Sequence, residues 1–332
     1  MINNYLYPTN FRLSTFAAKM VRREHIRASC AKLVGATLLL ASPGLTGSVV
    51  GQQLEPRAYS VSPVGTNIVV VGYGRSTGDL SFDPSLPITD ASATINGVYA
   101  GYFRSINFFG RSASVSVALP YAWGNLQGNV EGQFQQVRRS GLSDPSVRFA
   151  VNLRGAPAMD LKRFSTYQQK TTIGASVVVV APLGQYDPAK LINLSANRWA
   201  FKPEIGISRA MNRQLFLDFY LGAWLYTSNN NFQGRTRTQA PIASGQFHLS
   251  YNVKPKLWVA FDATFYAGGR TTVNGVRKDD FQRNSRVGGT LSYKLDRRQS
   301  VKFAYSRGAI TNIGADFQAV SVAYQYLWGR GL

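Results

Sequence analysis

The sequence predicts an all-β protein, a transmembrane antiparallel up-and-down β-barrel of about twelve strands. Three features predict this fold. Apolar residues alternate with small or polar residues along many short segments, no mature segment has the roughly 18 consecutive apolar residues of a spanning helix, and the connections alternate between short and long. The 332-residue chain has 31 Gly, 19 Phe and 17 Tyr but only 16% charged residues, a composition that suits a β-rich fold and argues against disorder.

Residues 1–51 are expected to be a leader with a cleavable secretory signal peptide. Four basic residues precede an apolar run, and Val49 and Gly51 are small enough for the −3 and −1 positions of a cleavage site. A short membrane anchor is the alternative, which the brevity of the run and its Gly and Pro residues disfavour. Met20 is a candidate true start, and residues 52–332 are expected to form a single barrel domain.

The alternation is clearest in residues 112–123, SASVSVALPYAW. Val115, Val117 and Leu119 point to one face of this expected strand, and small or polar residues point to the other. The apolar face could contact lipid or the second sheet of a soluble sandwich. The expected strands are 66–75, 92–104, 112–124, 146–154, 171–181, 199–208, 214–227, 242–253, 257–268, 285–295, 300–307 and 317–328.

The connections between these strands favour the membrane barrel. Short connections alternate with long ones, except for one longer stretch at 155–170. Outer-membrane barrels have short periplasmic turns and long external loops, and an even number of strands places both chain ends in the periplasm. A soluble sandwich or a two-domain β protein is the alternative, but neither requires loop lengths to alternate so regularly.

The last expected strand, VSVAYQYLW, ends in Trp328 and carries aromatic residues along one face. Outer-membrane barrels commonly end in such a strand, which their insertion machinery recognises. Four residues follow the tryptophan here, which departs from that pattern.

Several stretches of the mature chain resemble the transporter family named for the meta-cleavage pathway of phenol degradation. They include GLSDPSVRFAVNL and APLGQYDPAKLINLSANRWAFKPEIG, and the resemblance covers about residues 55–328. The resemblance implies a β-barrel in the outer membrane of a Gram-negative bacterium, and the family name reflects an association with aromatic catabolism. It supplies no site residues, so candidates must come from the strand pattern.

The polar face of each strand is expected to line the lumen. Three carboxylates and His248 on four neighbouring strands are expected to form one wall, with arginine and lysine side chains opposite. This arrangement would offer a transverse field and ring surfaces to a small, partly apolar solute. The alternative is that paired charges and rings fill the lumen for stability. The candidate lumen-lining residues are Arg148, Lys202, Glu204, Phe216, Asp218, Tyr220, Trp224, His248, Asp262, Arg286, Lys294 and Lys302, and the same parity places Arg104 and Arg154 on this face.

The positive charge of the chain does not indicate nucleic-acid binding. The net charge is +21, and removing the six basic residues and one glutamate of the leader leaves +16. The chain has no nucleic-acid motif and is expected to be exported. Much of the charge falls in expected loops and rims, as in DLKRF, GRTRT and DRRQS, and external loops that face anionic lipopolysaccharide would favour that sign. An excess of basic over acidic lumen residues predicts a mild anion preference.

No motif predicts an enzyme, a cofactor or a metal site. A Gly-rich phosphate loop and HExxH are absent, and one of the two histidines lies in the leader. His248 and Ser250 have the His-x-Ser spacing of outer-membrane phospholipase A, but parity points both into the lumen, whereas lipid hydrolysis needs them to face the bilayer. Asp279 and Asp280 make a poor cation site, and a solvated external loop is expected there.

The predicted function is passive uptake of small molecules, with aromatic compounds as the first candidates. A structural barrel with a plugged lumen is the second hypothesis, and lipid hydrolysis is the third.

Overall fold

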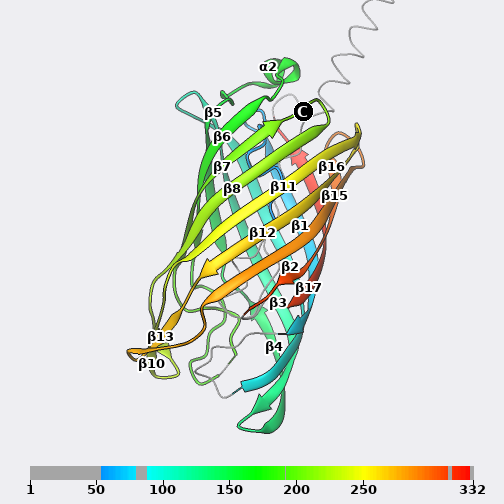
Figure 1. Ribbon diagram of the computed structural model, residues 1–332. Helices are drawn as coiled ribbons and strands as arrows, with labels where there is room; N and C mark the ends of the chain where they lie inside the picture. Colours follow the sequence, from blue (N-terminus) through cyan, green and yellow to red (C-terminus); the bar gives the residue numbers. More distant parts are fainter. Residues whose placement is uncertain (1–53, 80–87, 191, 313–315, 330–332) are drawn as a thin grey trace, which may run out of the picture.

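The computed structural model describes residues 54–79, 88–190, 192–312 and 316–329. Twelve antiparallel strands close into a barrel (Figure 1), which confirms the predicted fold class. The predicted leader lies outside the described residues. The barrel strands are β1 (Asn67–Asp79), β2 (Ile88–Phe108), β3 (Arg111–Val130), β5 (Ser146–Arg154), β6 (Thr171–Val180), β7 (Ala200–Ala210), β8 (Leu215–Tyr226), β11 (Ile242–Lys254), β12 (Leu257–Gly268), β15 (Gln282–Lys294), β16 (Gln299–Ile310) and β17 (Phe317–Trp328).

The barrel closes where its first strand meets its last. β1 pairs with β17 from Asn67 opposite Trp328 to Gly78 opposite Phe317, and it pairs with β2 on its other side. Each predicted strand corresponds to one barrel strand, with ends that differ by a few residues. β2 and β3 are longer than predicted, at 21 and 20 residues, because they stay paired beyond the predicted ends. The last part of β3 also pairs with β4 (Gln133–Leu142).

The connections divide between the two rims as predicted. One rim carries the start of β1, the end of β17, the short turns and the 155–170 connection, which contains α2 (Leu161–Thr166) (Figure 1). The Asp160 side chain begins α2 by accepting a hydrogen bond from the Arg163 amide at 2.8 Å. Within the described part of the chain, no helix has the length and apolar character needed to cross a membrane.

The other rim carries the long loops. Four short strands in two of these loops form a separate sheet that the alternation did not predict, because strands outside the barrel have no lipid-facing side. They are β9 (Asn229–Phe232), β10 (Arg235–Gln239), β13 (Thr271–Val273) and β14 (Val276–Arg277).

The two faces of the barrel wall follow the predicted alternation. Along β11, Phe247, Leu249 and Tyr251 are exposed on the outer face, whereas His248 and Ser250 are fully buried on the inner face. Exposed large apolar residues recur on all twelve barrel strands. This outer band is the lipid-facing surface of a transmembrane barrel.

Two basic residues do not lie where parity placed them. Arg104 is exposed, because in β2 the neighbouring Phe103 takes the inner face and packs in an apolar cluster there. Arg154 is exposed at the rim, because a register shift between Asn152 and Arg154 ends the regular alternation of β5. The predictions that Arg104 and Arg154 line the lumen are therefore wrong.

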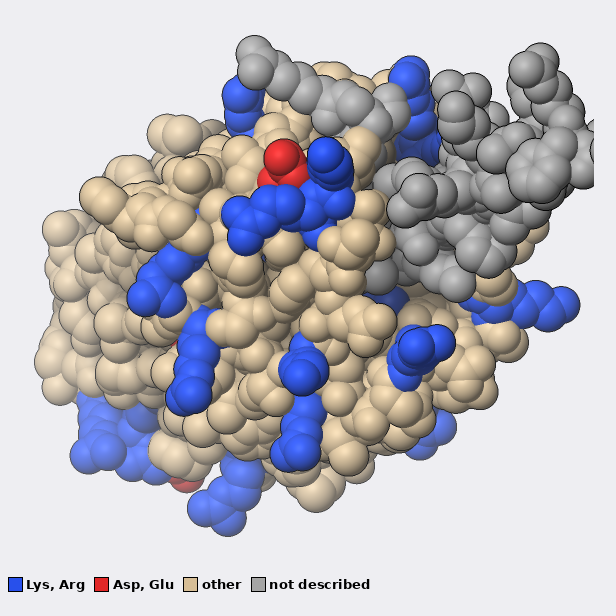
Figure 2. Space-filling model, turned by 90° about the horizontal axis from the view of Figure 1, so that it is seen from above, with Lys and Arg blue, Asp and Glu red and all other residues tan. Residues whose placement is uncertain are grey.

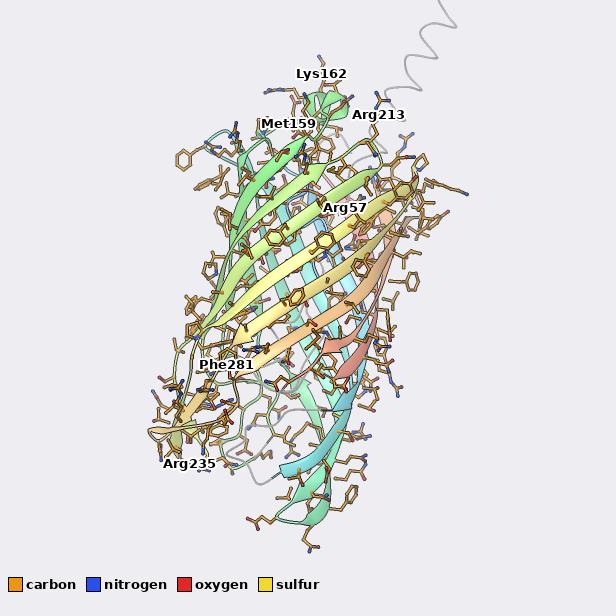
Figure 3. All side chains as sticks on the ribbon, in the orientation of Figure 1. Arg57, Met159, Lys162, Arg213, Arg235 and Phe281 are labelled. Atoms are coloured by element: carbon orange, nitrogen blue, oxygen red, sulfur yellow. The ribbon has the colours of Figure 1, made fainter. Side chains whose placement is uncertain are left out.

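The rim that carries the short turns is strongly basic. Figure 2 views this rim, and Lys and Arg side chains are spread over it with few acidic ones between them. Lys162 and Arg213 lie at this end of the barrel, and Arg235 lies at the other (Figure 3). The basic segments DLKRF and DRRQS thus belong to the short-turn rim, whereas GRTRT belongs to a long loop.

Candidate functional site: the barrel lumen

Residues 54–66, which precede β1, run inside the barrel, and we call them the lumen segment. The Arg57 amide donates a hydrogen bond to Asp218 Oδ2 on β8 at 3.0 Å. Toward the short-turn rim, the Val64 amide donates to the Met159 carbonyl at 2.8 Å. Figure 3 shows Met159 near the rim and Arg57 farther inside the barrel, so the segment enters the lumen from the short-turn rim.

Tyr59 anchors the lumen segment in a slot of the inner wall. Its ring lies over Gly174 of β6 and Gly206 of β7, which are cross-strand partners. A Cβ atom added to either glycine would lie 2.2 Å from the ring, so only glycine allows this approach. Tyr220 lies edge-on to Tyr59, with 5.1 Å between ring centroids. The Tyr59 side chain is consequently almost fully enclosed, with 1% of the residue exposed.

The Tyr59 hydroxyl joins a hydrogen-bond network centred on Glu204. It donates to Glu204 Oε1 and is bonded to Ser176 Oγ, each at 3.1 Å. Glu204 Oε2 accepts from Lys202 Nζ at 2.6 Å and from Gln246 Nε2 at 3.2 Å. These charge-assisted bonds fix the position of the buried carboxylate.

Arg148 completes this network instead of standing across the lumen from it. Arg148 Nη2 lies 3.7 Å from Glu204 Oε1 and donates to Ser176 Oγ at 3.2 Å. The prediction of an acidic wall opposite basic residues is therefore wrong for Arg148. The physical reason is that a buried charge is stabilised by a direct partner, so the opposite charges lie side by side.

Rings hold the Arg57 side chain of the lumen segment. Its guanidinium carbon lies 4.5 Å from the Trp258 ring centroid and 4.9 Å from that of Phe216. Its Nη2 donates to Asn252 Oδ1 at 2.7 Å. Burial lowers the pKa of Arg57 to about 10, against the opposing effect of Asp218, so Arg57 remains cationic at neutral pH.

His248 and Asp262 form a buried pair beside this segment. His248 Nδ1 lies 2.7 Å from Asp262 Oδ1, and Thr290 Oγ1 donates to the other carboxylate oxygen at 2.7 Å. His248 Nε2 lies 3.3 Å from Gln246 Oε1, so this nitrogen is directed away from Ser250. Both His248 and Ser250 are fully buried on the inner face. The geometry gives no support to lipid hydrolysis, which requires such groups to face the bilayer.

The remaining predicted residues also point inward. Arg286 is buried, with its guanidinium carbon 3.7 Å from the Phe317 ring centroid. Trp224 belongs to a buried apolar cluster with residues of β6, β7, β11 and β12. Lys302 is buried and Lys294 is half-buried. All twelve predicted lumen residues thus lie on the inner face, although whether they line a solute path stays a prediction.

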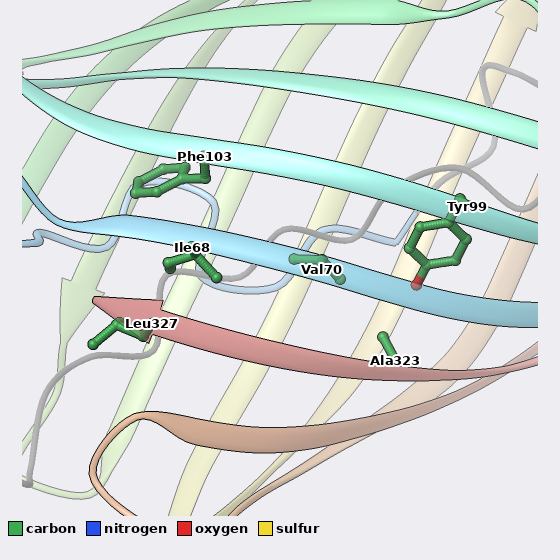
Figure 4. Packing of buried hydrophobic residues seen from close by; sticks show 6 residues of the cluster. All are labelled: Ile68, Val70, Tyr99, Phe103, Ala323 and Leu327. Carbon is green, nitrogen blue, oxygen red and sulfur yellow. The ribbon is translucent and has the colours of Figure 1, made fainter. Parts of the chain in front are cut away.

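The inner wall has two chemically different sides. We call the inner face of β6, β7, β8 and β11 the polar wall, because it carries the Glu204 and His248 networks. In strand order, β1, β2 and β17 lie across the barrel from it. We call the inner face of these three strands the apolar wall. It carries a cluster of buried residues (Figure 4), which are Ile68, Val70, Tyr99, Phe103, Ala323 and Leu327.

Sequence reasoning missed the lumen segment and its partners. Residues 54–66 precede the first alternating strand and have no strand pattern of their own, so nothing in them indicated a place inside the barrel. Ser176 and Gln246 have inward parity, but parity does not distinguish them from the other small or polar residues of the inner face. Gly174 and Gly206 lie side by side only because of the register between β6 and β7, and the sequence pattern does not determine that register.

The chain is similar to known barrel proteins. It matches the family described as "Putative MetA-pathway of phenol degradation" over residues 73–328. Among solved structures it is similar to the COG4313 outer membrane channel from Pseudomonas putida F1, with a TM-score of 0.70 and 19% identity over 83% of this chain and 100% of that chain. At this identity the likeness shows a shared fold.

Two further structures are similar at lower scores. The transport unit of the autotransporter AIDA-I from Escherichia coli has a TM-score of 0.47 and 11% identity over 91% of this chain and 97% of that chain. The CymD monoaromatic hydrocarbon channel has a TM-score of 0.43 and 8% identity over 82% of this chain and 90% of that chain. No curated protein sequence matches the chain.

Proposed function

The chain belongs to this phenol-degradation family, and from that premise and its closed barrel we propose that it is an outer-membrane channel for passive, non-enzymatic uptake of small molecules. The observation that carries the proposal is the lumen segment. Hydrogen bonds and ring contacts hold it, whereas the strands close by pairing with one another. The segment can therefore leave the lumen without exposing a strand edge.

Rings on the inner wall support aromatic compounds as the solutes. Phe216, Tyr220 and Trp224 lie along the inner face of β8, from near the short-turn rim toward the long loops. Aromatic pairs contribute about 0.5–1.5 kcal/mol beyond the burial of their area. A path lined in this way favours a ring-shaped solute over a sugar of similar size.

A structural barrel with a permanently plugged lumen is the second candidate. The enclosure of Tyr59 and the Arg57 contacts with Trp258 and Asn252 favour it, because they hold the segment at two separate points. The two candidates differ in whether the segment ever leaves.

Solute flux distinguishes these candidates. The channel proposal expects liposomes that contain the protein to swell faster in a small aromatic solute than in a sugar of similar size. Trp224→Ala should slow the aromatic solute more than the sugar, and Trp199→Ala, which changes a tryptophan exposed outside the lumen, should change neither. If neither the wild type nor Tyr59→Ala shows conductance in planar bilayers or solute flux, the structural barrel is the correct function.

We also propose that the short-turn rim faces the periplasm and that the long loops face the cell exterior beside lipopolysaccharide. The strand that ends at Trp328 would contact the barrel-insertion machinery. A protease site inserted at Asn230 should be cleaved on intact cells, whereas one at Asn212 should be protected. Cleavage with the opposite sidedness would reverse this orientation.

A further inference from the structure

The Tyr59 side chain is a phenol, and the barrel wall contacts each part of it. Two glycines accommodate the ring, an aromatic edge closes one side, and the hydroxyl both donates and accepts hydrogen bonds. The Arg148 guanidinium carbon also lies 5.2 Å from the centroid of the ring. We call this site the Tyr59 slot, formed by Gly174, Ser176, Glu204, Gly206 and Tyr220.

The slot belongs to the barrel and not to the lumen segment. Its five residues lie on β6, β7 and β8, and the two glycines have no side chains that could fill the space if the ring left. Lys202 and Gln246 hold the Glu204 carboxylate from its other oxygen. An empty slot therefore keeps its shape and presents Glu204 Oε1 without its 3.1 Å donor.

We propose that the Tyr59 slot is a binding site for a free phenol, and that Tyr59 occupies it as an intramolecular competitor. A phenol that enters the slot releases the anchor of the lumen segment and so clears the path. This inference deepens the proposed channel function and rests on it for its purpose, although binding itself does not require that anything cross the barrel.

The chemistry of the slot selects a neutral phenol. Burial, and then the Glu204 carboxylate, raise the pKa of the Tyr59 hydroxyl, so the group in the slot is protonated and can donate to Glu204. 4-Methylphenol reproduces the Tyr59 side chain from Cβ outward. Toluene keeps the ring but lacks the donor, so Glu204 Oε1 would lose the hydrogen bond that a phenol hydroxyl donates and would keep only its longer contact with Arg148.

Competition from Tyr59 sets the affinity that a free phenol shows. A side chain on a short flexible tether has an effective concentration on the order of mM. The apparent affinity for a free ligand falls in proportion to the fraction of molecules in which the slot is empty. The wild type should consequently bind free phenols weakly, and any change that weakens Tyr59 should tighten that binding.

Calorimetric titration of the full chain in detergent with 4-methylphenol tests this inference. Tyr59→Ala should bind with an apparent Kd at least about tenfold lower than that of the wild type. It should bind toluene at least about tenfold more weakly than 4-methylphenol, since a hydrogen bond to a charged group accounts for such a ratio. Equal affinity of wild type and Tyr59→Ala, or equal affinity for the two ligands, would overturn the proposal.

Two controls keep the result specific. Tyr99→Ala removes a tyrosine that lies over Gly72 on the apolar wall, and so creates a similar space that lacks the Glu204 acceptor. This variant should bind 4-methylphenol no better than the wild type. Gly174→Ala in the Tyr59→Ala background places a methyl group where the ring lay and should abolish the gain. If Tyr59→Ala does not fold, Tyr59→Phe should show the same direction of change, and unchanged affinity there would overturn the proposal.

Binding and flux separate this inference from the proposed channel function. Tight 4-methylphenol binding by Tyr59→Ala without solute flux in liposomes supports the slot and contradicts the channel. Flux of aromatic solutes without binding at the slot supports the channel and contradicts the slot.

Discussion

On opposite walls of the barrel, a tyrosine ring lies against glycine, but only one of these tyrosines belongs to the barrel. On the apolar wall, Tyr99 of β2 lies over Gly72, its cross-strand partner on β1, and a Cβ atom there would lie 2.2 Å from the ring. On the polar wall, Tyr59 lies over Gly174 at the same 2.2 Å. The same local packing fills the wall in one case and holds the lumen segment against the wall in the other.

The two walls are stabilised by different forces. The apolar wall loses stability when volume is removed, because a cavity remains. The polar wall loses stability when one member of a charge network is removed, because the others are left buried without a partner. Substitutions on each wall therefore test whether this division is correct.

The largest effect is expected at the centre of the polar-wall network. Glu204→Ala leaves Lys202 and Arg148 without the carboxylate that both contact, and should lower the free energy of unfolding by about 3–5 kcal/mol. Urea unfolding in detergent, followed by heat-modifiable gel mobility, measures this change. Glu204→Gln keeps the shape and an acceptor for Tyr59 and should cost less. An effect of Glu204→Ala no larger than that of Glu204→Gln would contradict the network.

The second prediction is that the strands of the polar wall and those of the apolar wall are equally sensitive to a charge on their outer, lipid-facing side. Leu249→Arg on β11 and Val71→Arg on β1 both place a charge on the lipid face, and each should cost about 2–4 kcal/mol near the bilayer midplane. Leu249→Phe and Val71→Ile, which keep an apolar group, serve as controls and should cost little. The folded fraction on gels after lipid reconstitution measures both. A cost for one site alone would mean that only one of these strands contacts lipid.

The uniformity of the outer face explains why the strands could be predicted. Lipid imposes the same requirement on every barrel strand, so the apolar period of two recurs from β1 to β17 and indicates each strand. The lumen imposes no common requirement. Phe103 takes the inner face of β2 for packing, and this reversal of the polar-in pattern is why Arg104 was misplaced.

The site could be predicted only where it lies on barrel strands. Glu204 and Lys202 share a strand two residues apart, so parity alone placed both inward. Parity could not show that Arg148, two strands away, would reach them, because that depends on register and side-chain length. Tyr59 could not be predicted at all, since it lies in a segment that has no strand pattern of its own.

The third prediction compares Gly72 with Gly174, one glycine from under each of the two tyrosine rings. Gly72→Ala places a methyl group against the ring of Tyr99, which cannot move away because it belongs to the paired strand β2. This overpacking should lower the free energy of unfolding of the barrel by about 1–3 kcal/mol. Gly174→Ala should cost the barrel less, because Tyr59 can swing out with its segment, and it should instead raise conductance in planar bilayers. Equal loss of stability with no change in conductance would mean that the segment is as fixed as a strand.

The smallest effect is expected from a single methylene on the apolar wall. Ile68→Val leaves a small void between β1, β2 and β17, and such deletions cost about 0.5–1.5 kcal/mol in a packed interior. Ile205→Val makes the same change on the outer face of β7, where mobile lipid tails can occupy the vacated space, so its effect should stay within about 0.5 kcal/mol, as for ordinary surface changes. Parallel urea titrations in lipid vesicles compare the two. Equal costs would mean that the apolar wall is as loosely packed as the lipid boundary.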